Sequence, residues 1–348
     1  MFEHLDDPRP PDFGPGARRA VVGRAQRRRR RRVAGGLGMA AASLVAGAGG
    51  LYGRAAYRAS QIERIEVAAG MSDAADGEPV TFLVRGVDGP RGAGDAGGRA
   101  DTVLLARLDP ATGAASLLSL PRDLLVTDPA TGGQVRINGL SADAQVAVVR
   151  DQLGIAVNHV AQIDLDGFGA LVDLVGGVEV AVPAPVRDTH SGLLLAQTGC
   201  VRVDGDQARA LVRARRLEVL DASGRWQPGR FGDLERTATQ RAVLVAALAD
   251  LAGRTDPLSV DRMAGWIRDH VAVDDDLGLG ELTDLIRAAL AVDPASVETA
   301  IVPVVPAEVD ANRLVVDPAA APAAIAAFSE GAALPDGIPL DRVVVDAC

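Results

Sequence analysis

The sequence predicts an α/β fold, a three-layer α/β/α sandwich around a central mixed sheet, preceded by one N-terminal transmembrane helix. Short β-branched segments alternate with amphipathic helical segments, a pattern that favours one sheet with helices on both faces. Hydrophobic residues make up 48% of the 348 residues, enough for a full core. Residues 33–52 contain no charge, and a helix of that length spans a hydrocarbon layer of about 30 Å.

The N-terminal region has the composition of a membrane anchor. Residues 1–32 are predicted to be a disordered, basic cytoplasmic tail that ends in unbroken arginines from Arg27 to Arg32. Residues 53–75 are predicted to form a stalk and residues 76–348 an extracytoplasmic domain. A cleaved signal peptide is the alternative for 33–52, but this stretch exceeds the usual apolar length of about 7–15 residues. A basic tail on a cytoplasmic protein would leave the uncharged stretch unexplained.

Charge is divided unevenly along the chain. Residues 1–58 hold 12 arginines and 4 acidic residues, so the remainder carries a net charge of −18 within a total of −10. Nucleic acid is therefore not an expected partner, because its phosphates are bound by basic patches and this body is acidic. The two cysteines, Cys200 and Cys348, can form a disulfide if the domain is extracytoplasmic; the alternative is that both are unpaired.

The first half of the domain is predicted to be rich in strands. Residues 79–87 form a strand that runs into a glycine-rich loop at 86–98. Residues 102–108 and 115–120 form a hairpin around the turn sequence at 109–113. Further along the chain come a helix at 141–153, a strand at 157–165, a short helix at 168–175 and a strand at 178–182.

The second half is predicted to be mainly helical. Apolar residues at helical spacing indicate helices at 205–213, 234–251, 258–271, 279–290 and 322–328, with one strand at 299–305. No internal repeat and no second domain is evident.

Several familiar catalytic sites are excluded by composition. The chain has no lysine and hence no P-loop, and it has no H-E-x-x-H, paired cysteine or G-x-S-x-G motif. Its four histidines are scattered, and a non-catalytic role is favoured for His159 and His190.

Arginines and acidic residues gather instead near predicted strand and helix ends. Asp233, Arg236 and Gln240 are spaced by three and four residues, so they share one helix face near an N-terminus, where anions are favoured. Each residue alone is typical of a surface charge. Together they indicate guanidinium groups that bind phosphate and carboxylates that hold a hard cation, as in phosphoryl transfer. The full set is Asp88, Arg99, Asp101, Arg122, Asp123, Arg213, Arg215, Asp233, Arg236 and Gln240.

Seven short motifs follow one another along about residues 81–251. They are FLVRGVD from Phe82, RAD from Arg99, SLPRD from Ser119, INGL from Ile137, DLDGFGALVDLVGGVEVAVP from Asp164, LVRARR from Leu211 and GDLERTATQR from Gly232. In this order they resemble the motifs of the LytR-CpsA-Psr family of cell-wall glycopolymer ligases, in an actinobacterial-like form.

The resemblance implies a magnesium-dependent phosphotransferase. Such an enzyme moves a phosphoglycosyl polymer from a polyprenyl-pyrophosphate carrier to a hydroxyl of peptidoglycan, without a covalent enzyme intermediate. By matching motifs, Asp88 and Asp101 are expected to hold magnesium. The expected pyrophosphate ligands are Arg99, Arg122, Arg213, Arg215, Arg236 and Gln240. Arg99, Asp101, Arg122 and Asp233 are expected to be catalytic, and Asp233 either orients the arginines or assists proton removal.

The chain departs from the family pattern in two places. Where the family usually has Arg-Gln-Gln, this chain has Thr239, Gln240 and Arg241. An insertion at 217–232 is expected to be a surface loop, although its Trp226 is an alternative sugar contact. The apolar faces around 157–175 suit either a lipid slot or an ordinary core.

Two other functions remain open at this stage. A lipid pyrophosphate hydrolase would use the same residues with water as the acceptor. A non-enzymatic, membrane-tethered wall-binding or regulatory protein is the other alternative. The sequence does not identify the glycopolymer.

Overall fold

The computed structural model describes residues 49–51, 53–67, 70–75, 77–87, 99–229, 233–252, 254, 256–308 and 310–335. The chain divides into two compact units, Met1–Gly53 and Arg54–Cys348, and the fold below is that of the second unit. The predicted tail, most of the predicted membrane span, Asp88 and Cys348 lie outside the described residues. Among the helices that are described, none combines the length and apolar character needed to cross a membrane.

A seven-stranded mixed sheet forms the centre of the domain. β2 (Val80–Val87) pairs in parallel with β7 (His159–Asp164) and antiparallel with β3 (Ala100–Leu108). The order across the sheet is β1 (Glu63–Ile65), β14 (Val271–Asp274), β7, β2, β3, β4 (Ala115–Leu120) and β15 (Glu298–Ile301). The predicted mixed sheet is therefore confirmed.

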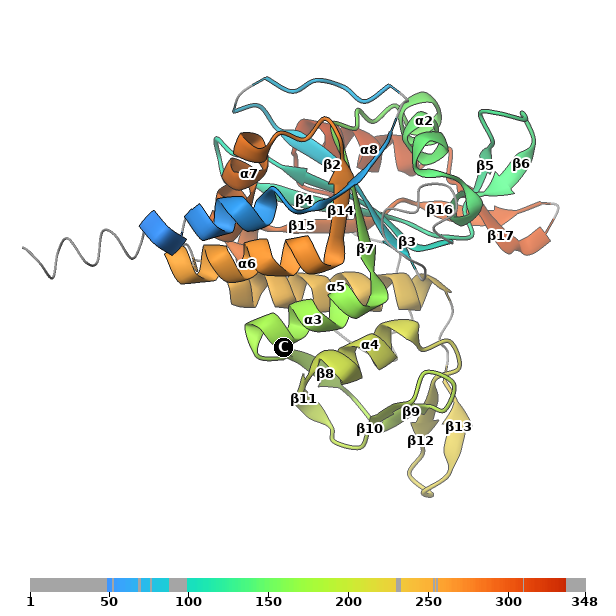
Figure 1. Cartoon of the computed structure of the whole chain (residues 1–348). Helices are drawn as coiled ribbons and strands as arrows, with labels where there is room; N and C mark the ends of the chain where they lie inside the picture. The colour runs from blue at the N-terminus through green and yellow to red at the C-terminus, as the bar shows by residue number, and fades with distance from the viewer. Residues whose placement is uncertain are drawn as a thin grey trace, which may run out of the picture. The chain divides into compact units, whose positions relative to one another are not determined.

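Helices cover both faces of this sheet, as Figure 1 shows. Successive residues of a strand point to opposite faces, so Leu83 packs in one apolar cluster while Phe82 and Val84 pack against the other. The Leu83 cluster includes α2 (Ala142–Leu153) and α8 (Ala321–Glu330). The other cluster includes α3 (Leu165–Val175), α4 (Gly205–Arg213), α5 (Asp233–Leu251), α6 (Pro257–His270) and α7 (Leu279–Ala291). The α/β/α arrangement is confirmed.

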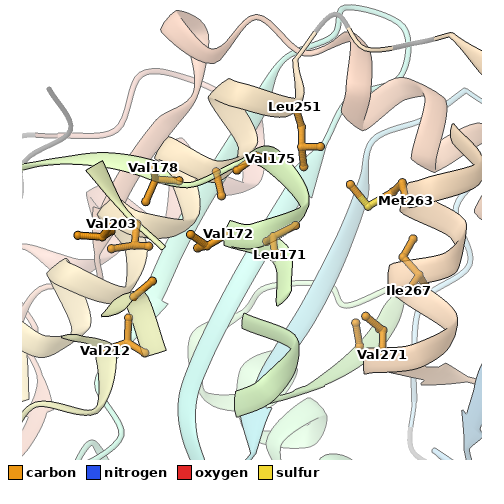
Figure 2. Packing of buried hydrophobic residues seen from close by; sticks show 14 of the residues in the cluster. Leu171, Val172, Val175, Val178, Val203, Val212, Leu251, Met263, Ile267 and Val271 are labelled. Carbon is orange, nitrogen blue, oxygen red and sulfur yellow. The ribbon is translucent and has the colours of Figure 1, made fainter. Parts of the chain in front are cut away.

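Side-chain caps fix the starts of the helices that carry the site. Asp204 caps α4, where a capping box forms with Gln207, and the Asp164 side chain accepts a hydrogen bond from the first turn of α3. α3 and α4 approach closely at Gly169, where a β-carbon would lie 2.9 Å from the carbonyl oxygen of Gly205. Figure 2 shows the valines and leucines of these helices packed together.

The insertion at 217–232 is not simply a surface loop. It contains β12 (Glu218–Leu220) and β13 (Trp226–Pro228), which form a hairpin. The hairpin extends a small sheet with β9 (Val186–Asp188) and β10 (Leu193–Leu195). The Arg187 guanidinium carbon lies 4.4 Å from the centre of the Trp226 ring, so this ring is used in packing.

Three short two-stranded sheets complete the domain. They pair β8 (Val178–Val182) with β11 (Gly199–Val203), β5 (Leu125–Thr127) with β6 (Gln134–Arg136), and β16 (Val304–Ala307) with β17 (Asp310–Val316). Two short 3₁₀ helices, Ile137–Gly139 and Pro294–Ser296, lie in the connections.

Three predictions from the sequence need correction. The helix expected at 258–271 ends at His270, because Val271 begins the buried strand β14. The strand expected at 299–305 is divided into β15 and β16. The stalk expected at 53–75 is wrong in part, because β1 joins the sheet and Ile62 is buried in the core.

Of the two cysteines in the sequence, the structure describes Cys200. Cys200 is disulfide-bonded, and Cys348, the other cysteine of the sequence, lies outside the described residues.

Candidate active site

The site lies at one edge of the central sheet. β2, β7 and β4 run in the same direction, and β3 runs opposite to them. The last residues of β2 and β7 therefore lie beside the first residues of β3, and Gly86 pairs with Thr102. A β-carbon at Gly86 would lie 2.8 Å from that of Thr102, so glycine allows the two strands to meet at this edge.

Asp101, at the start of β3, is the centre of an arginine cluster. Its Oδ1 accepts a 2.9 Å hydrogen bond from Nη1 of Arg122, and its Oδ2 accepts one of 2.8 Å from Nη2 of Arg215. Arg236 on α5 lies 3.9 Å from Oδ2, and its Nη2 donates to the Asp101 carbonyl oxygen at 3.5 Å. Three guanidinium groups from separate parts of the chain thus surround one carboxylate.

The pKa of Asp101 shows the electrostatic character of this cluster. Burial tends to raise the pKa of Asp101, but the hydrogen bond from Arg122 and the charges of Arg236, Arg122 and Arg215 outweigh it and lower the pKa below its ordinary value. Asp101 is therefore an anion at neutral pH and a poor proton acceptor. The surplus of guanidinium groups favours a further anion nearby.

Arg215 is positioned by a buried carboxylate in β9. Asp188 is fully buried, and its Oδ2 accepts backbone hydrogen bonds from Arg215 and Arg216 at 2.7 and 2.8 Å. Burial alone would raise the pKa of Asp188, but the backbone donors, first of all Arg216 and Arg215, lower it. Asp188 therefore fixes the chain where it leaves α4 and directs Arg215 toward Asp101.

A second carboxylate, Asp123, lies beside Arg122. Its Oδ2 is 3.8 Å from Nε of Arg122, and its Oδ1 is 3.3 Å from Nε of Arg136. Arg136 comes from β6, so the Arg122 loop is connected to the neighbouring small sheet.

An apolar pocket opens beside the cluster. It encloses about 810 Å³, including its open mouth. Asp101 and Asp164 are on its wall, together with apolar residues that include Leu165, Phe168 and Trp266. Its inner surface is therefore suited to an apolar group that is attached to a charged one.

Gln240 links the pocket wall to α4. Its Oε1 accepts a 3.0 Å hydrogen bond from Oγ1 of Thr102, and its Nε2 donates to the Val212 carbonyl oxygen at 3.2 Å. Gln240 is 8% exposed and lines the pocket. Its amide is thus held in place by two other elements, β3 and α4.

The structure does not bring all the predicted residues together. Arg99 and Arg213 are described and exposed, and neither contacts Asp101. Asp88 lies outside the described residues, and the side chain of Asp233 does as well. The roles expected for these four residues remain predictions.

Sequence reasoning missed several residues of the site. Arg136, Asp188 and Trp266 lie in segments with no charged motif, and only the fold brings them here. Arg241 departs from the family pattern, and this hides its place in the site. Its spacing of four from Thr237 puts both residues on one face of α5, where both line the pocket.

Arg85 has a structural role despite its place in the first motif. It is 2% exposed and donates to the side-chain oxygens of Gln145 and Gln162 and to the carbonyl oxygen of Leu140. Its hydrogen bonds join β2 to α2 and β7, on the sheet face opposite to the pocket.

The carboxylate oxygens of Asp101 are suited to bind magnesium. Its carboxylate is ionised, and each oxygen retains a lone pair beyond its arginine contact. Within the described residues no group of three or more acidic, histidine or cysteine side chains forms a metal site. Asp101 thus fits as one ligand of a cation, and its predicted companion is Asp88.

Comparisons with known proteins show which proteins this chain resembles. The TagU protein of Bacillus anthracis, called a polyisoprenyl-teichoic acid–peptidoglycan teichoic acid transferase, is 31% identical over 192 residues, which are 52% of this chain and 58% of TagU. The probable cell wall biosynthesis protein LcpB of Corynebacterium glutamicum is 32% identical over 160 residues, 45% of this chain and 35% of LcpB. The chain therefore matches little more than half the length of these relatives at most.

A solved structure covers more of the chain. The LytR-Csp2A-Psr enzyme from Actinomyces oris superimposes with a TM-score of 0.63 and 26% identity, over 77% of this chain and 96% of that structure. The TagV structure of Bacillus subtilis, at 20% identity and a TM-score of 0.57, has the same fold. Because the family model of the LytR_cpsA_psr family also matches residues 51–324, most of the sequence, the chain belongs to the LytR-CpsA-Psr family.

Proposed function

We propose that this protein is a phosphotransferase that moves a phosphoglycosyl polymer from a polyprenyl-pyrophosphate carrier to a hydroxyl of peptidoglycan. The observation that carries the proposal is the position of the Asp101 arginine cluster at the wall of an apolar pocket. A lipid pyrophosphate has the matching parts, an anionic head and an apolar tail. The activity for which TagU is named supports the same class of substrate. Two structures with this fold are TagT bound to LI-WTA and TagT bound to LIIa-WTA.

The apolar tail has room beyond the first pocket. A second pocket is lined by Phe82, Ala106 and Leu248. The first pocket is lined by residues at matching positions of the same elements. Val84 is two residues from Phe82 on β2, and Leu104 is two residues from Ala106 on β3. Leu244 is four residues from Leu248 on α5. Residues at these spacings lie on the same face of a strand or helix, so both pockets follow the same β2–β3 surface along α5. Two successive pockets suit a long isoprenoid chain.

The reaction is a direct displacement at phosphorus. The acceptor hydroxyl oxygen forms a bond to the glycan-side phosphorus, and the bond from this phosphorus to the bridging oxygen breaks. The electron pair of the broken bond stays on the bridging oxygen, which leaves with the lipid phosphate. The hydroxyl proton passes to water or to Asp233, since Asp101 has a lowered pKa.

The arginine cluster supplies charge stabilisation for this step. Arg122, Arg215 and Arg236 are fixed by Asp101 before substrate binds, so little reorganisation is needed when negative charge develops on phosphate oxygens. Asp101 and Asp88 are the proposed ligands of magnesium. When bound, magnesium neutralises charge on the phosphate oxygens.

We place the protein at the cell membrane, with the N-terminus cytoplasmic and the catalytic domain outside. The arginine run before the uncharged segment 33–52 supports this orientation. The disulfide at Cys200 is consistent with an oxidising compartment. An anchor of this kind would hold the pocket near the lipid carrier.

The test uses the full-length chain in detergent with a polyprenyl-pyrophosphate glycan, magnesium and peptidoglycan oligomers. Wild type is compared with Arg122→Ala and with Arg262→Ala, which removes an exposed arginine of α6. We expect glycan linked to peptidoglycan, a loss of about a hundredfold in Arg122→Ala, and no loss in Arg262→Ala.

The other outcomes select other functions. Release of lipid phosphate and phosphorylated glycan without ligation would indicate the hydrolase. Absence of both lipid turnover and lipid binding in wild type would leave a tethered binding or regulatory protein. The transferase proposal requires that the glycan become covalently linked to the peptidoglycan oligomers.

A further inference from the structure

Arg241 is a charged residue on the wall of an otherwise mainly apolar pocket. It is four residues after Thr237 and three before Leu244 on α5, and all three line the pocket. Leu244 continues toward Leu248 and the second pocket, whereas Thr237 directly follows Arg236 of the Asp101 cluster. Arg241 therefore lies at the transition between the charged cluster and the apolar part of the first pocket.

No described residue forms a hydrogen bond or ion pair with Arg241. Its Nη1 atom is buried and has no hydrogen-bond partner. Burial is the sole cause that lowers the pKa of Arg241, without any opposing contribution from a carboxylate. Arg122, Arg215 and Arg236, in contrast, each contact Asp101.

An unpaired guanidinium in such a place destabilises the fold. Arg241 as a whole is half-buried, but its buried Nη1 atom has lost its water partners and gained no protein partner, and an apolar side chain of similar size would pack there at lower cost. The stability of the domain thus gives no reason for arginine here. A ligand that brings an anion into the pocket would provide one.

We propose that Arg241 binds the lipid-side phosphate of the substrate, the group that leaves when the glycan-side phosphorus is attacked. This inference rests on the proposed function and assigns a residue to the leaving group. The guanidinium plane can donate two parallel hydrogen bonds to phosphate oxygens. The neighbouring Leu244 and Phe168 accommodate the first part of the alkyl chain attached to that phosphate.

The position also suits the transfer step. When the bridging bond breaks, its electron pair increases the negative charge on the lipid phosphate. A guanidinium already desolvated beside this phosphate stabilises that charge more strongly than one in water. Arg241 is then a catalytic residue that acts on the leaving group, while the Asp101 cluster acts on the glycan-side phosphate.

The test compares binding of geranylgeranyl phosphate with binding of the neutral alcohol geranylgeraniol to the full chain in detergent. The variants are Arg241→Met, which keeps an unbranched side chain, Arg241→Lys, which keeps the charge, and the exposed control Arg262→Met. We expect Arg241→Met to raise the Kd for the phosphate at least tenfold and to leave the Kd for the alcohol within about twofold. The Kd of Arg241→Lys for the phosphate should lie between those of wild type and Arg241→Met, since lysine keeps the charge but lacks the planar guanidinium that donates two parallel hydrogen bonds.

Thermal unfolding separates binding from a structural role. Arg241→Met should unfold at the same or a higher temperature than wild type, because it removes a guanidinium whose buried Nη1 has no hydrogen-bond partner. A lower unfolding temperature together with equal weakening for both probes would overturn the inference, as would an unchanged Kd for the phosphate. If wild type binds neither probe, the proposed lipid substrate fails as well, whereas phosphate binding unaffected by Arg241→Met refutes only the role of Arg241.

Discussion

At the scale of single residues, Asp188 has an effect that its sequence position does not reveal. Its two carboxylate oxygens accept backbone hydrogen bonds on both sides, from His190 and Ser191 and from Arg215 and Arg216. From the sequence alone, Asp188 is only an acidic residue at the end of a short strand. Only the fold shows that it fixes the chain that carries Arg215 to the Asp101 cluster.

We predict that Asp188→Asn lowers the free energy of unfolding by about 1–3 kcal/mol, because an amide nitrogen would then face backbone donors on one side. Chemical denaturation of the two proteins measures this. Transfer activity should fall as well, since Arg215 loses its fixed backbone.

A matched control is Asp221→Asn. Asp221 accepts hydrogen bonds from the backbone of Ser223 and Arg225, but it is partly exposed in a hairpin turn, where water can replace a lost partner. If Asp221→Asn lowered the free energy of unfolding as much as Asp188→Asn, burial would not explain the effect at Asp188.

The chemistry of the site residues could be predicted more readily than their geometry. Arginines next to acidic residues at strand ends indicated phosphate binding, and the fold brings Asp101, Arg122, Arg215 and Arg236 into one cluster. Contacts such as Arg215 with Asp101 join residues 114 positions apart, and spacing along the chain carries no signal for them.

At the scale of elements, the close packing of α3 on α4 depends on Gly169. We predict that Gly169→Ala destabilises the domain by about 1–3 kcal/mol, because its β-carbon would meet the backbone oxygen of Gly205 and the helices would have to separate. The free energy of unfolding in denaturant measures the effect.

Gly280→Ala is the control for this substitution. Gly280 is also helical, in α7, and no atom lies within 4 Å of the position its β-carbon would take. Alanine should stabilise that helix by up to about 1 kcal/mol. Equal effects of the two substitutions would show that helix propensity, not the helix contact, determines the result.

His159 joins three elements through hydrogen bonds. Its Nδ1 lies 3.2 Å from Asp274 at the end of β14, and its Nε2 lies 3.2 Å from Glu281 of α7. Burial tends to lower the pKa of His159, but the hydrogen bonds and charges of Asp274 and Glu281 outweigh it and raise the pKa above the ordinary value of 6.5. The sequence supported only a non-catalytic role for His159, and its contacts are structural.

This raised pKa predicts that stability falls as the pH increases. The folded state binds the proton more tightly, so the contribution of His159 is complete below pH 6.5 and is lost as the pH rises through the folded-state pKa. The free energy of unfolding should therefore decline on the alkaline side in wild type, and the decline should be smaller in His159→Gln. An identical pH dependence in both proteins would show that folding does not raise the pKa of His159.

Element bounds were predictable where local chemistry defines the ends. The helix at Gly205–Arg213 and the strand at Val178–Val182 have their predicted bounds, the first behind a capping box and the second behind a glycine turn. β14 was missed because its apolar residues continue the pattern of α6, and periodicity alone does not separate a helix end from a short buried strand.

At the scale of the whole molecule, α5 connects the charged cluster to both pockets. Arg236 contacts Asp101 near its start, Leu244 lines the first pocket, and Leu248 lines the second. The sequence showed one amphipathic helix with a charged beginning. That its apolar face is only partly covered, and leaves space against β2 and β3, depends on the side chains of the other helices and could not be predicted from periodicity.

This arrangement predicts that affinity depends on the length of the lipid. Ala106→Phe should fill part of the second pocket and leave the first open, because Ala106 lines only the second. We expect the Kd for a diphosphate with eight isoprene units to rise about tenfold or more, and the Kd for geranyl diphosphate to change less than about twofold. Val84→Phe, which narrows the first pocket, should weaken both ligands. Binding to the full chain in detergent measures these constants, and equal weakening of the short and long lipids by Ala106→Phe would mean that the tail does not reach the second pocket.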